Sequence, residues 1–252
     1  MKHQKAALVT GSAIRLGKAI AIALAQSGFD IALHYYSSSD KAAETQAEIR
    51  AIGVACELFP QDLADASSLE TFVGQVKEKM PHLSVLVNSA SAYTSGEIES
   101  TSVDMFDQQF SINLRAPFFL SKGFAKHCQS GHIINICDNK IAYNQYAYAA
   151  YLLSKKALAE FVKIAALEFA PNIRVNGVAP GVVLPADTRS DDYINWRIQG
   201  IPLQKQGTTK NITSAVVHLV DNDFMTGQVL MVDGGEAIAH IGRNATQYKA
   251  DK

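Results

Sequence analysis

The chain has 252 residues, 48% of them hydrophobic, and its 23 basic and 24 acidic residues leave a net charge of −1. This balance favours a globular protein over a disordered chain and argues against binding to nucleic acid or an anionic membrane. The cysteines Cys56, Cys128 and Cys137 form no Cys-x-x-Cys pair, so we expect buried free thiols rather than disulfides, and no metal site.

Short apolar segments alternate with helical patterns along the chain. The first begins directly after Lys5, which leaves no room for a signal peptide. No apolar run reaches the roughly 18 residues of a membrane span, so we expect a cytoplasmic protein. The alternation is typical of βαβ units and predicts an α/β fold. We expect a single domain over residues 1–252, with one doubly wound, Rossmann-type parallel sheet of about seven strands and helices on both faces.

The expected strands share short, apolar sequences, and the expected helices share longer patterns of helical period. Strands are expected over Ala6–Thr10, Ile31–Tyr35, Val54–Phe59, Val85–Asn88, Ile133–Ile136, Ile173–Val178 and Val229–Val232. Helices are expected over Arg15–Ser27, Lys41–Ile52, Ser67–Met80, Met105–Cys128 (one or two helices, with Pro117 at a start or a kink), Ala150–Phe169 and near Lys210–Val220.

Two segments have no clear pattern. Pro180–Pro202 is irregular, and we expect it to lie over the site as a lid. After Gly235 the tail has an apolar start (Ala237–Ile241) and a polar end (Arg243–Lys252). It either covers a neighbouring subunit or frays.

A glycine-containing turn, Thr10-Gly11-Ser12-Ala13-Ile14-Arg15-Leu16-Gly17, joins the first expected strand to the first expected helix. Gly11 permits a tight turn and Gly17 permits close contact between helix and strand. The helix N-terminus then offers free N–H groups to a pyrophosphate. For this motif alone, an ordinary glycine-rich turn stays an alternative.

The second expected strand ends in His34-Tyr35-Tyr36-Ser37-Ser38-Ser39, which contains no acidic residue. An acid at this strand end would bind the ribose diol of NAD and repel a 2′-phosphate. Hydroxyl groups can instead donate hydrogen bonds to a phosphate, so the segment favours NADP. A flexible polar turn is the competing interpretation.

Three residues have a spacing that suits proton transfer. Tyr151 and Lys155 lie four positions apart and therefore share one helix face, where the ammonium can lower the pKa of the phenol. Such a phenol donates a proton to a carbonyl or imine that receives a hydride. Asp138, thirteen positions before Tyr151, cannot donate a hydrogen bond while ionised, and its charge opposes Lys155. It suits a substrate with N–H donors, or a proton relay. Alternatively, Asp138 is a solvated acid, and Asn139 or a hydroxyl group bonds the substrate.

The turn at Gly11–Gly17 and the Tyr151/Lys155 pair resemble motifs of the short-chain dehydrogenases/reductases, and the resemblance spans Ala6–Gly235. Arg15 replaces that family's middle glycine, and Asp138 replaces its serine. Both replacements resemble the pteridine reductase branch, as does Asn88-Ser89-Ala90-Ser91-Ala92-Tyr93. That branch often carries Arg where this chain has Ser37.

The resemblance implies a role for each motif residue. Tyr93 would stack on a pterin, Asn113 would hold a water beside Lys155, and Asp62 would reach the adenine, with a helix cap as its alternative. The implied catalytic residues are Asp138, Tyr151, Lys155 and Asn113. The implied substrate-binding residues are Arg15, Ser91, Tyr93, Asp138 and Tyr151. The implied cofactor-binding residues are Gly11, Arg15, Leu16, Gly17, His34, Tyr35, Ser37, Ser38, Asp62, Leu63, Asn88, Ala90, Ser91, Lys155, Pro180 and Gly181.

These expectations combine into an NADPH-dependent reduction of a pterin or dihydropterin, of the dihydrobiopterin, dihydromonapterin or dihydrofolate type, by hydride transfer to a ring C=N. The alternatives are a reductase of 3-oxoacyl thioesters or other carbonyls, and a nucleotide-binding regulator without chemistry. The resemblance also implies a homotetramer in which the helices over Met105–Cys128 and Ala150–Phe169 pack across an interface.

Overall fold

A seven-stranded parallel sheet organises the chain, which the computed structural model describes over residues 5–185 and 189–239. The strand order is β3-β2-β1-β4-β5-β6-β7, so the winding reverses between β1 and β4. This confirms the predicted doubly wound, Rossmann-type sheet. The strands are β1 (Lys5–Val9), β2 (Phe29–Tyr35), β3 (Cys56–Pro60), β4 (Leu83–Asn88), β5 (Gly131–Ile136), β6 (Ile173–Pro180) and β7 (Val229–Val232).

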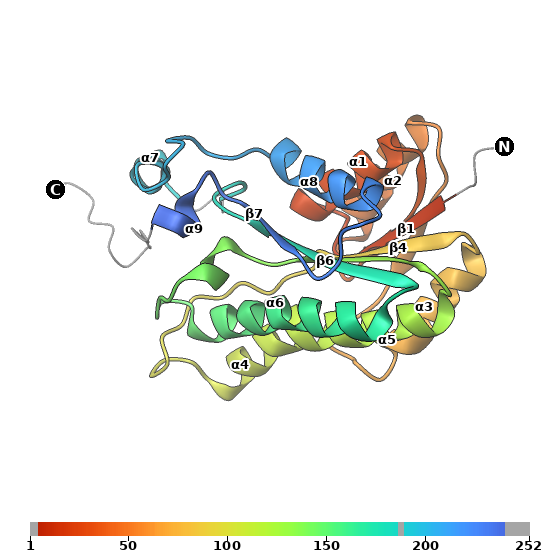
Figure 1. The fold of residues 1–252 in the computed structure, drawn as a ribbon, viewed down its shortest axis with the longest axis horizontal. Helices are drawn as coiled ribbons and strands as arrows, with labels where there is room; N and C mark the ends of the chain where they lie inside the picture. Colours follow the sequence, from red (N-terminus) through yellow and green to blue (C-terminus); the bar gives the residue numbers. More distant parts are fainter. Residues whose placement is uncertain (1–4, 186–188, 240–252) are drawn as a thin grey trace.

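Helices cover both faces of this sheet (Figure 1). The buried residues of β1 alternate between the two faces: Ala6 and Leu8 join one apolar cluster, and Ala7 and Val9 join the other. A strand buried on both faces needs a continuous apolar sequence, which β1 has. One layer holds α1 (Arg15–Gln26), α2 (Ser39–Ala51) and α8 (Thr209–Asp221), and the other holds α3 (Leu69–Lys79), α4 (Val103–Phe110), α5 (Ala116–His127) and α6 (Ala149–Phe169).

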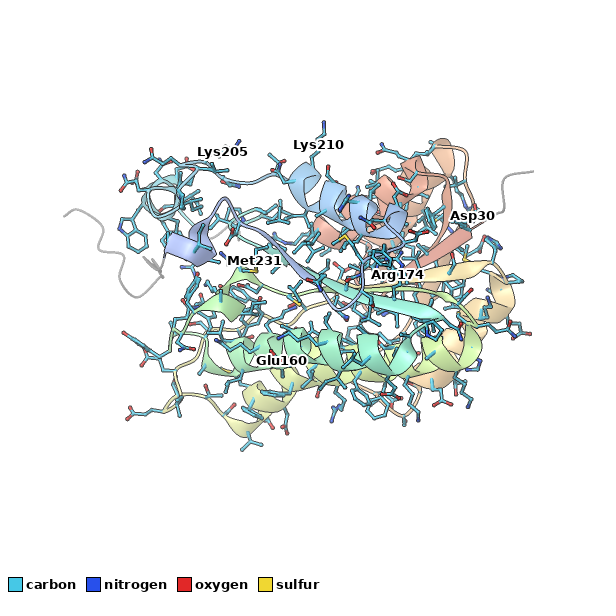
Figure 2. All side chains as sticks on the ribbon, viewed as in Figure 1. Asp30, Glu160, Arg174, Lys205, Lys210 and Met231 are labelled. Carbon is cyan, nitrogen blue, oxygen red and sulfur yellow. The ribbon has the colours of Figure 1, made fainter. Side chains whose placement is uncertain are left out.

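Side chains fill the space between the sheet and both helix layers (Figure 2). Cys56, Cys128 and Cys137 are among them, buried and free as predicted. Within the described ranges, no helix combines the length and the apolar character needed to cross a bilayer.

The segment predicted as one or two helices is a continuous helical rod with a wider turn in its middle. The π-helical turn η1 (Ser111–Arg115) follows α4 directly and leads into α5. Pro117 lies in the first turn of α5, directly after this wider turn. Turns of this kind are frequent at functional sites, and η1 carries Asn113.

The expected lid contains a helix that we did not predict, α7 (Asp191–Ile198). The Ser190 hydroxyl accepts a hydrogen bond from the Tyr193 N–H at 3.2 Å, and Asp191 and Asp192 occupy the first turn. Both features stabilise a helix start, so the prediction of an irregular segment is wrong here.

Two further short helices went unpredicted, η2 (Asn139–Ala142) after β5 and α9 (Glu236–Ala239) after β7. Residues 186–188 of the expected lid and 240–252 of the tail lie outside the described residues.

Candidate active site

A cleft of about 570 Å³ opens where the central strands end. Its lining includes Gly11 after β1, Ser89 after β4, Cys137 after β5 and Pro180 at the end of β6. The cleft therefore lies at the carboxyl ends of the strands, beside the point where the winding reverses. In doubly wound sheets this is the position of ligand sites.

The turn after β1 brings backbone atoms close together. A Cβ on Gly17 would lie 2.2 Å from the Gly11 carbonyl oxygen, and Gly11 itself has φ +63°. Thr10 Oγ1 accepts hydrogen bonds from the N–H groups of Ser89 (2.9 Å) and Ala90 (3.1 Å), which joins this turn to the end of β4.

The start of α1 fits a dinucleotide phosphate. Its N-cap residue, Ile14, makes no side-chain cap, and the first turn holds no acidic residue. The first N–H groups of α1 therefore face the cleft without a capping side chain, beside a turn that only glycine permits at Gly11 and Gly17.

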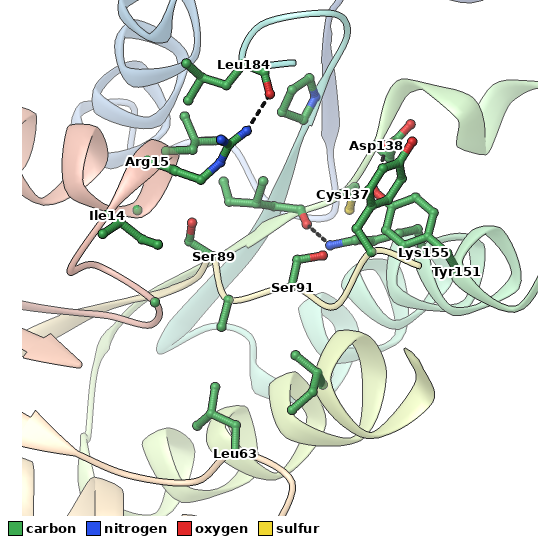
Figure 3. A pocket seen from close by; sticks show the side chains of 18 of the residues that line it. Ile14, Arg15, Leu63, Ser89, Ser91, Cys137, Asp138, Tyr151, Lys155 and Leu184 are labelled. Carbon is green, nitrogen blue, oxygen red and sulfur yellow. Dashed lines mark hydrogen bonds between the residues drawn. The ribbon is translucent and has the colours of Figure 1, made fainter. Parts of the chain in front are cut away.

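Arg15 has an unusual backbone for a residue with a side chain, φ +52°. The left-handed backbone conformation costs such a residue about 1 kcal/mol or more, whereas a glycine would adopt it without this strain. Its guanidinium Nη2 donates a hydrogen bond to the Leu184 carbonyl at 2.7 Å (Figure 3). Arg15 thereby spans the cleft from the nucleotide turn to the segment after β6.

His34 joins three strand ends below the cleft. Its Nδ1 accepts the Gly11 N–H at 2.9 Å, and its Nε2 lies 3.1 Å from the Gln61 carbonyl oxygen. The ring must therefore carry its proton on Nε2 and stay neutral. Burial lowers the pKa of His34 from 6.5 to about 4.

Tyr151 and Asp138 are hydrogen-bonded within the cleft. The Tyr151 hydroxyl donates to Asp138 Oδ2 at 2.7 Å, and Figure 3 shows the two side chains together. Asp138 Oδ1 accepts the Lys140 N–H at 2.8 Å. Asp138 is thus turned toward the phenol rather than into bulk solvent. Asn139, the alternative partner for a substrate, points elsewhere: its amide group donates to Glu236 Oε2 at 2.9 Å.

The charge of Lys155 is not the main influence on the pKa of the Tyr151 phenol. Burial first, and then the charge and hydrogen bond of Asp138, raise the pKa of Tyr151 well above 10. Lys155 donates its Nζ hydrogen bond to the Ile136 carbonyl at 2.8 Å, and burial lowers its own pKa. The prediction of a lowered phenol pKa is therefore wrong for this arrangement, because both groups are buried and the Asp138 carboxylate accepts a hydrogen bond from the protonated phenol.

Three tyrosines form an aromatic cluster beside this pair. Tyr93 stacks on Tyr148 with ring centroids 4.7 Å apart and planes 11° apart, and it meets Tyr151 edge to face at 4.7 Å. Tyr93 is 52% exposed, so part of its ring is open to a ligand. Tyr148 is buried; the Arg189 guanidinium donates to its hydroxyl at 2.7 Å, and Lys140 Nζ lies 5.3 Å from its ring centre.

Asn113 holds the loop that carries Tyr93. Its Oδ1 accepts the Ala92 N–H at 2.9 Å and the Ser91 hydroxyl at 3.0 Å, and its Nδ2 donates to the Ala92 carbonyl at 2.9 Å. The side chain also bonds Ser154, one position before Lys155 in the chain. The expected water beside Lys155 stays a prediction, and the bonds here assign Asn113 to loop support.

Most of the predicted site residues line the cleft, and five do not, among them Asn113. Ser37 and Ser38 lie outside the lining, and so does Tyr35, which packs against the apolar cluster under α1. Asn88 is buried and donates to Asn135 Oδ1. Asp62 lines the cleft, but it caps no helix: it accepts the Ala64 N–H, and α3 begins only at Leu69.

Several lining residues escaped the sequence analysis. Tyr36 and Ser89 each neighbour a predicted residue on a strand end, where a shift of one position changes the face. The Cys137 thiol also faces the cleft, and burial raises its pKa to about 12, so it stays protonated. The lining residues that were missed are Ile14, Tyr36, Ser89, Ile112, Ile136, Cys137, Val183 and Leu184.

The chain is similar to known reductases over most of its length. A family model described as enoyl-(acyl carrier protein) reductase matches residues 11–236, which include the turn after β1 and the Tyr151 helix. A 3-oxoacyl-[acyl-carrier-protein] reductase from Staphylococcus aureus is 31% identical over 243 residues, 93% of this chain and 99% of the relative.

Solved structures share the fold closely. FolM alternative dihydrofolate reductase 1 from Brucella suis, in complex with NADP, has a TM-score of 0.90 at 28% identity and covers 98% of this chain and 99% of its own. A blue fluorescent protein from a metagenomic library, in complex with NADPH, has a TM-score of 0.85 at 30% identity, with coverages of 92% and 98%.

Proposed function

The chain belongs to the short-chain dehydrogenase/reductase family, and we propose that it is an NADPH-dependent reductase of pterins or dihydropterins. The observation that carries this proposal is the 2.7 Å hydrogen bond from the Tyr151 hydroxyl to Asp138. A serine beside the phenol would donate to a carbonyl oxygen, whereas an ionised carboxylate only accepts. The pocket therefore suits a ring that offers N–H groups next to the reduced bond.

NADPH is the cofactor that the cleft fits. Gly11, Leu16 and Gly17, with the uncapped start of α1, would hold its pyrophosphate. Arg15 would supply positive charge beside the phosphates and the substrate. When bound, NADPH supplies the hydride for a C=N carbon of the substrate. The structures of similar fold with NADP or NADPH support this choice.

Residues of the chain itself donate the proton that the reduction requires. Tyr151 is a neutral donor because its pKa is raised by burial and by Asp138, so it carries a proton at neutral pH. It gives that proton to the ring nitrogen adjacent to the reduced carbon. The tyrosinate that forms faces the positive charge of Lys155, whose Nζ lies 5.9 Å from the Tyr151 ring centre. Asp138 takes up a proton from solvent and passes it to the tyrosinate, which restores the phenol and the carboxylate.

Tyr93 provides the platform for a flat heterocycle. Its ring is held by Tyr148 on the protein side and is half exposed on the other. Offset stacking on such a ring favours an aromatic or conjugated substrate over a flexible acyl chain. Ser91 and Arg15 line the same cleft and offer polar contacts.

A second candidate is the reduction of 3-oxoacyl thioesters. It is favoured by the Staphylococcus aureus relative and by the description of the matching family model. The non-enzymatic alternative, a nucleotide-binding regulator, has less support because Tyr151 and Lys155 both line the cleft.

We further propose that the protein is a homotetramer that associates through α5 and α6. Apolar side chains are exposed on both helices, with Phe118 48%, Ile164 62% and Leu167 84% exposed. Exposed apolar residues gathered on adjacent elements mark association surfaces.

The proposed activity is tested by mixing the purified protein with NADPH and each of several dihydropterins, and following the absorbance of the reduced nicotinamide. We expect turnover of at least one dihydropterin. Absence of turnover with every pterin, together with activity on a 3-oxoacyl thioester, would overturn the proposal in favour of the second candidate.

A further inference from the structure

A buried ion pair links helices α7 and α9. On α7, Arg197 Nη2 donates to Glu236 Oε1 of α9 at 2.6 Å, and the two side chains are only 5% and 2% exposed. Figure 1 shows α7 and α9 together at one end of the molecule. This pair lies outside the cleft lining, and nothing in the proton-transfer scheme above uses it.

The same carboxylate reaches the turn that carries Asp138. Glu236 Oε2 accepts the Asn139 side-chain N–H at 2.9 Å, and Asn139 also donates to Asp233 Oδ2 at 3.3 Å. Asn139 directly follows Asp138, and the Asp138 carboxylate closes the same turn by accepting the Lys140 N–H. Glu236 therefore holds one residue next to the carboxylate that bonds the phenol of Tyr151.

Burial makes the Arg197–Glu236 ion pair energetically costly. Removing a carboxylate and a guanidinium from water costs several kcal/mol for each ion, and a well-packed apolar pair is often as stable. A buried ion pair does, however, fix the geometry of its two side chains, provided that their hydrogen bonds are satisfied. Here Glu236 accepts from two different elements, α7 and η2, so its geometry constrains helix α7 and the Asp138 turn together.

We propose that Glu236 is a positioning residue that fixes the Asp138 turn against Tyr151 and connects it to helix α7. This inference rests on the proposed role of Asp138 in proton transfer. Loss of the Asn139–Glu236 bond frees the turn, which lets Asp138 leave the 2.7 Å contact with the Tyr151 hydroxyl. The stacked Tyr93 and the turn after β1 lie on other elements and stay in place.

Two variants test the link from opposite sides. Glu236→Gln keeps the size of the side chain but cannot accept from both partners, and Asn139→Ala removes the link while leaving the Arg197–Glu236 pair. We expect both to lower kcat by about tenfold or more, as for a misplaced catalytic group, with the KM for NADPH within about twofold of the wild type. We also expect both to change the pH dependence of kcat, because the hydrogen bond to Tyr151 is altered.

The matched control is Asp30→Asn. Asp30 accepts from the His82 ring at 2.8 Å with 8% of its side chain exposed, and it lies at the end of the molecule opposite α7 and α9 (Figure 2). This variant should lose stability and leave kcat and its pH dependence unchanged. If Glu236→Gln and Asn139→Ala behave like Asp30→Asn, with an unchanged kcat per folded molecule, Glu236 is only structural and the inference is overturned.

Hydrogen–deuterium exchange gives a readout that does not need the substrate. Peptides covering residues 137–143 should exchange faster in Glu236→Gln and Asn139→Ala, and at the wild-type rate in Asp30→Asn. Unchanged exchange in the first two variants overturns the inference. A wild-type protein that reduces no dihydropterin overturns the proposed function instead, and the same variants can then be compared on the substrate that it does reduce.

Discussion

A carboxylate in hydrogen-bond contact changes what a catalytic tyrosine can do. Asp138 stabilises the protonated phenol of Tyr151, since its charge raises the phenol's pKa in addition to burial. The Tyr151 phenol consequently stays protonated over the whole neutral pH range. Transfer of its proton then depends on the basicity of the substrate atom that receives it. Reduction of a C=N bond creates a strongly basic nitrogen, which is why this pairing suits an imine in a ring.

Arg15 combines backbone strain with an exposed charge, and a change to glycine separates the two. Arg15→Gly relieves the left-handed backbone and should raise the free energy of unfolding by up to about 1 kcal/mol, while losing the bond to Leu184. The KM for NADPH or for the dihydropterin should rise about 10- to 100-fold, as for the loss of a charge-assisted hydrogen bond of about 1.5–3 kcal/mol. Steady-state kinetics and urea unfolding measure the two effects.

Gln204→Gly is the matched control, because Gln204 is the other non-glycine residue with positive φ within the described ranges. It lies on an exposed turn outside the cleft. It should gain stability without any change in KM. An Arg15→Gly enzyme with wild-type KM values for both ligands would show that the guanidinium contacts neither.

The sequence predicted that Asp138, Tyr151 and Lys155 come together, as they do in the cleft, but it predicted their surroundings less well. The spacing of Tyr151 and Lys155 on one helix, and the strand end before Asp138, suffice to bring these three groups together. The direction of the Tyr151 pKa was predicted wrongly, because it depends on how deeply the phenol is buried. Tyr148 was not recognised as part of the site, since its contact with Tyr93 depends on the path of a loop.

At the scale of elements, the strand ends determine which side chains meet. His34, the last residue but one of β2, bonds both the Gly11 turn and the Gln61 carbonyl after β3. A neutral imidazole is required there, because its Nδ1 accepts a hydrogen bond. The segment around the cofactor end of the cleft is thus stable only while this ring is uncharged.

His34 therefore makes stability depend on pH in a defined direction. Its pKa falls from 6.5 in the unfolded chain to about 4 in the fold, so the unfolded state binds the proton first as the pH decreases. The contribution is fully present above about pH 6.5 and is lost as the pH falls toward about 4, by roughly 3 kcal/mol. His34→Gln should flatten this part of the curve of unfolding free energy against pH, measured by urea unfolding.

An exposed histidine provides the comparison. His218 lies on the solvent side of α8, so His218→Gln is the control for replacing a histidine that has no part in the cleft. His132, whose pKa burial lowers to about 3, remains in all variants and contributes equally to each. An identical acid dependence in His34→Gln and the wild type would contradict the neutral role of His34.

Helices and strands were predicted correctly where the hydrophobic periodicity extends over many residues. The predictions failed where a capping residue or a local turn determines the structure. Helix α7 follows Ser190 and two acidic residues, a helix start that the surrounding irregular sequence obscured. The π-helical turn around Asn113 spans only five residues, which is too short to show a sequence period of its own. Its effect on the site is nevertheless direct, since Asn113 supports the Tyr93 loop.

At the scale of the molecule, the alternation of apolar segments and helices predicted the doubly wound sheet, because parallel strands require crossover helices. The order in which the strands pair brings the ends of β1, β4, β5 and β6 to one cleft. Residues far apart in the chain, such as Arg15 and Leu184, meet there. No local sequence pattern predicts that contact.

Association should depend on the exposed apolar face of α6. The double variant Ile164→Glu/Leu167→Glu places charges on side chains that are 62% and 84% exposed in the single chain. We expect the folded chain to tolerate both charges and the tetramer to dissociate, as measured by sedimentation velocity. Ile52→Glu, at an exposed apolar position after α2, should leave the assembly intact. A double variant that sediments like the wild type would exclude this face from the interface.

The most direct measurement compares the wild type with Asp138→Ser on a dihydropterin and on a 3-oxoacyl thioester, both with NADPH. The account predicts that the wild type prefers the dihydropterin, and that the serine variant loses about 100-fold or more of that kcat/KM while its activity on the ketone is kept or rises. A wild type that prefers the ketone, or a serine variant that reduces the dihydropterin at the original rate, would contradict it.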